Sequence, residues 1–271
     1  MSGFSADWLA LREPYDARAR CSRLERALAA WAAARPRLEV ADLGSGTGAN
    51  LRRLAPLLPP GQRWRLIEHD PRLIAAGEAM PPPTVARRYL RADLAEDLDR
   101  LLAAPLDLVT ASALLDLVSA SWLDRLADLI ATRRAAALFV LSWDGRIALD
   151  PPHADDAVIA GLVRRHQRTD KGFGPAFGPD AVPRLAARLK EAGGRLETGR
   201  SDWVYGPAAG PLHRALVDGW AAAAREIEPA AATRVQAWRR DRLDAPPARG
   251  LVGHQDLLWL PENERSKGAA A

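Results

Sequence analysis

The amino-acid sequence predicts an α/β fold with a mostly parallel sheet, and three observations support this prediction. A short apolar run from Leu38 to Val40 leads through an acid directly into a glycine-rich turn. Leucines at helical spacing follow that turn until Pro59 and Pro60 end the pattern. Apolar runs then alternate with helical patterns along the chain, which is typical of strand–helix–strand units.

The glycine-rich turn places glycine at every second position from Gly44 to Gly48. Glycine permits a positive φ and removes the Cβ atoms that keep a ligand away from the backbone. A strand, such a turn and a helix together favour a nucleotide-like ligand at the helix N-terminus. A P-loop is excluded because no Gly-Lys-Ser/Thr sequence follows the glycines.

The second apolar run, Trp64 to Ile67, also ends in acids. Glu68 lies about 20 residues past the last glycine, the offset at which an acid reaches the ribose hydroxyls of a nucleotide. Asp70 precedes a proline, so we expect it to cap the next helix. Glu68 is therefore the expected ribose ligand, with a solvated charge at the strand end as the alternative.

Asp42 stands two residues before the first glycine, which gives the pattern Asp-x-Gly-x-Gly-x-Gly. This pattern resembles the first motif of class I S-adenosylmethionine-dependent methyltransferases, and the resemblance covers residues 37–145. It implies the Rossmann-like methyltransferase fold: a seven-stranded, mostly parallel sheet with helices on both faces. The implied strand order is 3-2-1-4-5-7-6, with the seventh strand antiparallel.

The resemblance also implies which residues bind S-adenosylmethionine and its product S-adenosylhomocysteine. They belong to the glycine turn and to the ends of the second, third and fourth strands. The implied cofactor-binding residues are Asp42, Gly44, Ser45, Gly46, Gly48, Glu68, His69, Asp93, Leu94, Ala111 and Ser112. Asp93 is expected to accept a hydrogen bond from the adenine amino group, and no metal is expected.

We expect three parts in the chain. They are an N-terminal helical segment over the cofactor site at 1–35, a methyltransferase domain at 36–261 and a disordered tail at 262–271. The domain divides into a cofactor half at 36–145 and an acceptor half at 146–261. In the resembled family an N-terminal helix often contacts the methionine part of the cofactor, and Arg12 and Tyr15 are the candidates here.

A helical insertion at 206–247 separates the two last expected strands, Leu196–Tyr205 and Leu251–Leu260. In the resembled family these strands usually form a simple hairpin, so the insertion is a departure. Trp220 and Trp238 supply apolar area to it. Three roles stay open: a lid over the substrate, a homodimer surface and a plain structural core.

Methyl transfer requires mainly an aligned nucleophile, and a general base only where the nucleophile arrives protonated. The candidate catalytic residues are Asp116 after the fourth strand, Asp144 at the end of the fifth, and His166 beside a glycine-rich loop. Alternatives stay open for both acids. Asp116 would instead cap the helix that begins near Ser121, and Asp144 would form an ordinary turn with Gly145.

Motifs that the sequence lacks narrow the class of methyl acceptor that we expect. No Asn/Asp-Pro-Pro-Tyr/Phe tetrapeptide follows the expected fourth strand, which disfavours methylation of exocyclic base nitrogens. We expect O- or N-methylation of a small metabolite, with Trp143 as an apolar wall and Arg146 as a carboxylate partner for it. A protein or RNA acceptor, a non-catalytic cofactor-binding protein and a nicotinamide-dependent oxidoreductase stay open as alternatives.

The composition indicates a cytoplasmic protein. With 271 residues, 48% of them hydrophobic, the chain can form one large α/β domain. No apolar run approaches the roughly 18–20 residues that span a bilayer, so no membrane partner is expected. Its single cysteine, Cys21, excludes an internal disulfide. The 38 Lys and Arg against 34 Asp and Glu are scattered along the chain, so nucleic acid is not expected as a partner.

Overall fold

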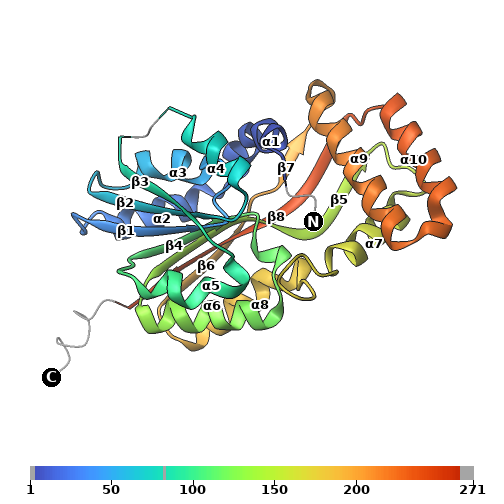
Figure 1. Cartoon of the computed structure of the whole chain (residues 1–271). Helices are drawn as coiled ribbons and strands as arrows, with labels where there is room; N and C mark the ends of the chain where they lie inside the picture. The colour runs from blue at the N-terminus through green and yellow to red at the C-terminus, as the bar shows by residue number, and fades with distance from the viewer. Residues whose placement is uncertain (1–3, 82–83, 263–271) are drawn as a thin grey trace.

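The computed structural model describes residues 4–81 and 84–262, in which one sheet is flanked by helices (Figure 1). The strands are β1 Leu38–Leu43, β2 Gln62–Glu68, β3 Ala86–Arg91, β4 Leu108–Ser112, β5 Ala136–Asp150, β6 Arg195–Arg200, β7 Trp203–Tyr205 and β8 Arg249–Leu260. The helices are α1 Ala6–Ala19, α2 Ser22–Ala32, α3 Ala49–Leu54, α4 Pro71–Glu78, α5 Leu94–Ala103, α6 Ala120–Arg133, α7 Asp156–Gln167, α8 Ala181–Glu191, α9 Gly210–Ile227 and α10 Ala232–Asp244. Except for residue 262, the predicted tail lies outside the described residues.

The strand order is β3-β2-β1-β4-β5-β8-β6, and β7 also pairs with β8. The first five strands pair in parallel, whereas β8 runs antiparallel to its neighbours. This confirms the predicted order, with β8 in the place of the expected seventh strand. The carboxyl ends of β1, β2 and β4 therefore meet at one edge of the sheet, where open α/β sheets bind ligands.

The described residues contain eight strands, so the predicted number of seven was wrong. The expected strand Leu196–Tyr205 is divided into β6 and β7, which pair with β8 in one continuous register. Asp202 lies at the break, and its Oδ1 accepts a hydrogen bond from the His254 N–H at 3.1 Å. A side-chain oxygen thus takes the place of a ladder carbonyl, and the strand is interrupted there.

Two apolar layers cover the two faces of the sheet. Helices α5, α6 and α8 pack on one face, with Leu98, Leu126 and Leu185 fully buried. Helices α2 and α3 pack on the other face, with Leu28 and Leu51 fully buried. Burial of such a side chain contributes about 1.5–3 kcal/mol. Helices on both faces hold the central strands in place, so the loops at the carboxyl edge stand on a rigid base.

The predicted helix start at Asp70 is confirmed, because its side chain accepts a hydrogen bond from the Arg72 N–H at 2.8 Å. The alternative that Asp116 caps the helix after the fourth strand was wrong. That helix is α6, and Ser119 caps it by accepting from the Trp122 N–H at 3.3 Å. Asp116 therefore does not cap α6.

Strand β5 is longer than predicted, because antiparallel pairing with β8 continues past Trp143 to Asp150. The segment from Trp143 to Arg146 therefore lies inside the strand and not at its end. The pairing register shifts twice, between Phe139 and Ser142 and again between Trp143 and Ile147. These irregularities turn the strand where it leaves the parallel part of the sheet.

The predicted helical insertion is confirmed and forms α9 and α10 between β7 and β8. Together with α7 it makes a helical lobe at the end of the long β5 and β8 strands (Figure 1). Trp220 and Trp238 are buried there in one apolar cluster with Trp143 and Trp203. Structural core is therefore one role of the insertion, while the lid and homodimer roles stay predictions. Among the described residues, no helix is both long enough and apolar enough to cross a bilayer.

Candidate functional site

The glycine-rich turn joins β1 to α3 in the conformation that its sequence predicts. Gly44, Gly46 and Gly48 have φ angles of +63°, +54° and +80°. A Cβ on Gly46 would lie 3.0 Å from Leu9 Cδ1 of α1. Any side chain at Gly46 therefore meets both backbone strain and the helix that covers the turn.

Glu68 holds this turn from the end of β2. Its Oε2 accepts a hydrogen bond from the Gly46 N–H at 2.9 Å, and its Oε1 accepts from the N–H groups of His69 and Asp70 at 2.8 and 3.0 Å. Glu68 is buried, so the alternative of a solvated charge was wrong. A carboxylate has about four acceptor positions, so room for a ribose hydroxyl remains. The ribose role stays a prediction.

Two adjoining cavities lie beside the turn, with volumes of about 60 Å³ and about 230 Å³. The smaller cavity brings together five of the predicted cofactor residues: Asp42, Gly44, Ser45, Gly46 and Ser112. The larger lies between α1 and α3. Asp16, Asn50 and Ser112 line both, so the two cavities are parts of one depression at the carboxyl edge.

Asp42 is the buried acid of this depression and has no exposed surface. Its Oδ1 accepts a hydrogen bond from Asn50 Nδ2 at 2.8 Å, while its Oδ2 is buried with no hydrogen-bond partner. Burial raises the pKa of Asp42 to about 7. The hydroxyl of Ser45, on the same cavity, also lacks a partner. The depression thus presents an acceptor and a hydroxyl to a ligand.

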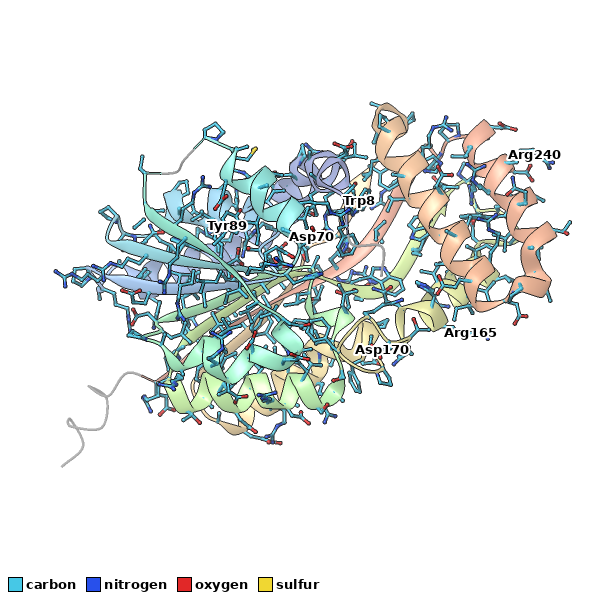
Figure 2. All side chains as sticks on the ribbon, in the orientation of Figure 1. Trp8, Asp70, Tyr89, Arg165, Asp170 and Arg240 are labelled. Atoms are coloured by element: carbon cyan, nitrogen blue, oxygen red, sulfur yellow. The ribbon has the colours of Figure 1, made fainter. Side chains whose placement is uncertain are left out.

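Helix α1 covers the depression with Leu9, Arg12 and Asp16. Arg12 donates two hydrogen bonds to Asp16, and its guanidinium lies 5.0 Å from the centre of the Trp203 ring. Figure 2 shows Trp8 of α1 together with Asp70 on one side of the sheet end, and Asp170 on the other. Helix α1 therefore lies over the depression, and the division of the chain into three parts stays a prediction.

The other predicted cofactor residues do not line the two cavities. The His69 ring is mostly exposed, and Asp93 is exposed and caps α5 by accepting from the Ala95 N–H at 2.8 Å. Leu94 and Ala111 are buried in the apolar layer under α5 and α6. Their roles toward a cofactor stay predictions.

Asp116 is buried beyond the end of β4. Its Oδ1 accepts from the Trp143 N–H at 3.3 Å, and its Oδ2 accepts from Gln167 Nε2 at 2.8 Å. Burial raises the pKa of Asp116, while the hydrogen bond from Gln167 lowers it. The structure thus brings Asp116 and Trp143 together, but neither of them lines the cavities.

Asp144 and Arg146 contact each other inside the bulge of β5. The Arg146 guanidinium also donates to both oxygens of Asp202, and these two acids raise its pKa. A Cβ on Gly253 would lie 2.2 Å from Asp144 Oδ1, so the glycine makes room for this ion pair. Both side chains are therefore engaged in holding β5, β7 and β8 together.

His166 lies apart from the other two catalytic candidates. Its Nε2 is 3.3 Å from Glu226 Oε2, and Lys171 Nζ is 3.4 Å from its Nδ1. Burial and the Lys171 charge lower the pKa of His166. The next residue, Gln167, donates a hydrogen bond to Asp116.

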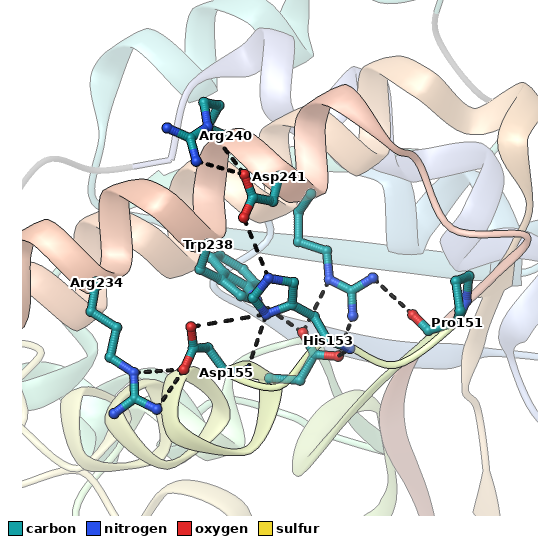
Figure 3. Close-up of polar contacts among 9 residues, drawn as sticks. Pro151, His153, Asp155, Arg234, Trp238, Arg240 and Asp241 are labelled. Atoms are coloured by element: carbon teal, nitrogen blue, oxygen red, sulfur yellow. Dashed lines mark hydrogen bonds and ion pairs between the residues drawn. The ribbon is translucent and has the colours of Figure 1, made fainter.

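A polar cluster of another kind fixes the helical lobe (Figure 3). We call it the lobe cluster, and it comprises Pro151, His153, Asp155, Asp156, Arg234, Trp238, Asp241 and Arg242. Arg242 forms an ion pair with Asp156 and donates to the Pro151 carbonyl at 2.9 Å. Trp238 Nε1 donates to Asp156 Oδ1 at 2.8 Å. These bonds attach α10 to the turn between β5 and α7.

Sequence reasoning missed Asn50, Gln167 and Arg20 as site residues. Asn50 had a usable signal, because it is a polar side chain in the first turn of the helix that follows the glycines. Arg20 and Gln167 had none, because they reach the site through tertiary contacts over 30 and 51 positions of the chain.

No protein-family model and no curated protein matches the chain. The crystal structure of a cyclopropane-fatty-acyl-phospholipid synthase-like protein from Lactobacillus casei aligns at a TM-score of 0.57 and 14% identity, covering 95% of each chain. YcgJ from Bacillus subtilis aligns at 0.48 and 10%, covering 90% of this chain and 100% of that one. Cyclopropane synthase MmaA2 from Mycobacterium tuberculosis aligns at 0.42 and 16%, covering 82% and 78%.

At such low identity a structural likeness concerns the fold alone, and of these three alignments the one with the Lactobacillus casei protein exceeds a TM-score of 0.5. The observed strand order, in which the antiparallel β8 lies between β5 and β6, is also the order that the resemblance implied. The chain therefore has the Rossmann-like fold of class I S-adenosylmethionine-dependent methyltransferases.

Proposed function

We propose that the chain is an S-adenosylmethionine-dependent methyltransferase that transfers a methyl group to an oxygen or nitrogen of a small metabolite. One observation carries the proposal. The glycine turn and Asp42, whose Oδ2 has no hydrogen-bond partner, line one depression at the carboxyl edge of the sheet. Backbone amides and a buried carboxylate suit a ligand that joins a nucleoside to an amino group.

When bound, S-adenosylmethionine supplies a methyl group that its positive sulfur has already activated. The chain's own residues then have to bind and orient the reactants, which is where most of the rate gain of such a reaction arises. A general base is dispensable where the acceptor arrives deprotonated. This agrees with a site in which Asp116 and Asp144 both accept hydrogen bonds from other groups of the protein.

The proposal includes an outward movement of α1. The cavities of about 60 and 230 Å³ are each smaller than the roughly 300–1,000 Å³ typical of small-molecule sites. Leu9 of α1 faces Gly46 directly. A nucleoside over the glycine turn therefore requires α1 to shift, and slower amide exchange in α1 after ligand addition is the expected sign.

Two experiments test the proposal. Calorimetric titration should detect S-adenosylhomocysteine and not NAD, and the reverse result would assign the site to a nicotinamide cofactor. Incubation with a donor labelled at its methyl group should then label a small-molecule fraction of a cell extract. Protein, RNA and unsaturated phospholipid vesicles are tested in parallel, the vesicles because the Lactobacillus casei protein is named after a fatty-acyl phospholipid.

The outcomes separate the alternatives. Label in the small-molecule fraction supports the proposed acceptor class, and label confined to another fraction replaces it. Binding of S-adenosylhomocysteine with no transfer to any fraction indicates a non-catalytic cofactor-binding protein. Gly46→Val serves as the control that should lose both binding and label.

A further inference from the structure

Two buried charged side chains beside the cavities are held apart by one amide. Arg20 Nη1 donates to Asn50 Oδ1 at 2.8 Å, and Asn50 Nδ2 donates to Asp42 Oδ1 at 2.8 Å. The second nitrogen of the guanidinium, Arg20 Nη2, and the second oxygen, Asp42 Oδ2, are buried without hydrogen-bond partners. Asn50 thus separates a cation from an anion and leaves one atom of each free.

Buried polar atoms without a hydrogen-bond partner destabilise a folded protein, and those of a charged group do so more strongly. The Arg20 side chain is only 3% exposed. Burial lowers the pKa of the Arg20 guanidinium, as expected for a cation in a poorly solvated position. Such groups are normally satisfied in native structures, and a ligand in the adjoining cavities would complete their hydrogen bonds.

Both residues border the depression described above. Asp42 lines the smaller cavity, Arg20 lines the larger one, and Asn50 lines both. A group bound across Asn50 therefore meets a carboxylate on one side and a guanidinium on the other. This arrangement complements a zwitterion, with an ammonium at Asp42 and a carboxylate at Arg20.

The neighbouring acids do not complete the hydrogen bonds of Arg20. Glu25 Oε1 lies 2.8 Å from Arg20 Nε, but Glu25 also pairs with Arg53 at 2.6 Å, so one carboxylate serves two guanidinium groups. Asp256 attracts Arg20 at longer range, while its oxygens accept from the N–H groups of Cys21 and Leu141. Arg20 Nη2 remains available to a ligand carboxylate.

We propose that Arg20 binds the α-carboxylate of the amino-acid end of the cofactor, opposite the ammonium at Asp42. The inference rests on the proposed function, because S-adenosylmethionine is the ligand that would bring both groups. The inference assigns cofactor binding to the segment between α1 and α2. The sequence had instead predicted cofactor contacts in the glycine turn and at Arg12.

Three ligands and the full-length chain test this assignment by calorimetry. S-Adenosylhomocysteine carries both groups, its decarboxylated analogue keeps the amine, and methylthioadenosine has neither. The wild-type chain should lose roughly 10- to 150-fold in affinity when the carboxylate is removed from the ligand, the range for a hydrogen bond to a charged group. Arg20→Met should lower the affinity for S-adenosylhomocysteine by a similar factor and leave that for the decarboxylated analogue unchanged.

Glu25→Gln is the matched control, because it removes the ion-pair partner and keeps the guanidinium. It should lower the melting temperature and leave the preference for the carboxylate intact. If Arg20→Met does not fold, Arg20→Lys keeps the charge and removes Nη2. The comparison of the three ligands on wild-type protein needs no variant.

The outcomes also distinguish the inference from the function beneath it. Equal affinity of the wild-type chain for all three ligands overturns the inference and leaves the proposed cofactor in place. Equal losses for all three ligands in Arg20→Met also overturn it, because Arg20 is then a structural residue. A wild-type chain that binds none of them overturns the proposed function, and the inference falls with it.

Discussion

The lobe cluster and the depression under α1 use the same kinds of side chain but differ in how completely these are satisfied. In the part of the chain that the structure describes, every buried polar side-chain atom of the lobe cluster has a partner (Figure 3). Under α1, by contrast, Asp42, Ser45 and Arg20 each keep buried atoms without one. A saturated cluster stabilises the fold, whereas unsaturated atoms at a cavity are suited to a ligand.

The difference shows why charged residues alone do not locate a site. An Asp–Arg pair occurs in both regions, as Asp156 with Arg242 and as Asp42 near Arg20. In the lobe the two groups contact each other directly. Under α1 the amide of Asn50 keeps them apart, so each retains an open hydrogen-bonding position.

The largest expected effect is the loss of ligand binding at the depression. Gly46→Val should abolish binding of S-adenosylhomocysteine, because a side chain there meets Leu9 and a φ of +54°. A left-handed conformation adds a cost of about 1–2 kcal/mol for a residue other than glycine. Calorimetry is the measurement, and Gly193→Ala is the control at another positive-φ glycine. Normal binding by Gly46→Val would exclude the glycine turn from the site.

Asp156→Ala tests the lobe cluster, the other region of the comparison, and should lower the free energy of unfolding. It leaves Arg242 buried without its carboxylate and removes the acceptor of Trp238 Nε1. Loss of one partner of a buried ion pair costs about 3–5 kcal/mol, which chemical denaturation measures. Affinity for S-adenosylhomocysteine should stay within about twofold, since distant sites act independently. A large loss of affinity would show that the lobe cluster also supports the cofactor site.

Glu68 shares features of both regions. Its carboxylate accepts hydrogen bonds from three backbone N–H groups of the protein, and one acceptor position remains for a ligand hydroxyl. Glu68→Ala should weaken S-adenosylhomocysteine binding by roughly 10- to 150-fold if the carboxylate binds the ribose. Because Glu68 is buried and holds three backbone N–H groups, the free energy of unfolding should fall as well. Glu39→Ala is the control, because the Glu39 side chain pairs with the exposed guanidinium of Arg63. Unchanged affinity would remove Glu68 from the ribose site.

The last expected effect is the pH dependence that Asp42 imposes on the free energy of unfolding. Burial raises its pKa from 3.8 to about 7, so between these pH values the folded chain keeps a proton that the unfolded chain releases. The free energy of unfolding should therefore fall as pH rises through this window, and the loss should end above pH 7. Asp42→Asn should flatten this slope in denaturation curves.

Ligand binding should show the opposite trend. A ligand ammonium pairs with the ionised form of Asp42, so affinity for S-adenosylhomocysteine should rise with pH by at most about tenfold per unit. The difference between the wild-type chain and Asp42→Asn isolates this group from the other buried acids. Parallel pH profiles would show that Asp42 does not face the ammonium.

The fold was largely predictable because its signals are local in the sequence. The glycines at 44, 46 and 48, the cap at Asp70 and the apolar runs each act through neighbouring residues. The division of the sixth strand was not predictable, because it depends on the contact between Asp202 and His254 across two strands. The extension of β5 likewise depends on its pairing with β8.

The sequence by itself determined the glycine turn and the acids at the strand ends, whereas the order of the strands followed from the resemblance to a known family. Backbone conformation and hydrophobic burial act through short-range patterns, so one chain suffices to read them. Only the tertiary structure decided which polar atoms keep partners. Arg20 and Asp42 become a pair of open hydrogen-bonding groups because folding brings α1, β1 and α3 around Asn50. Hydrogen-bond satisfaction depends on three-dimensional neighbours, and no local pattern in the sequence records them.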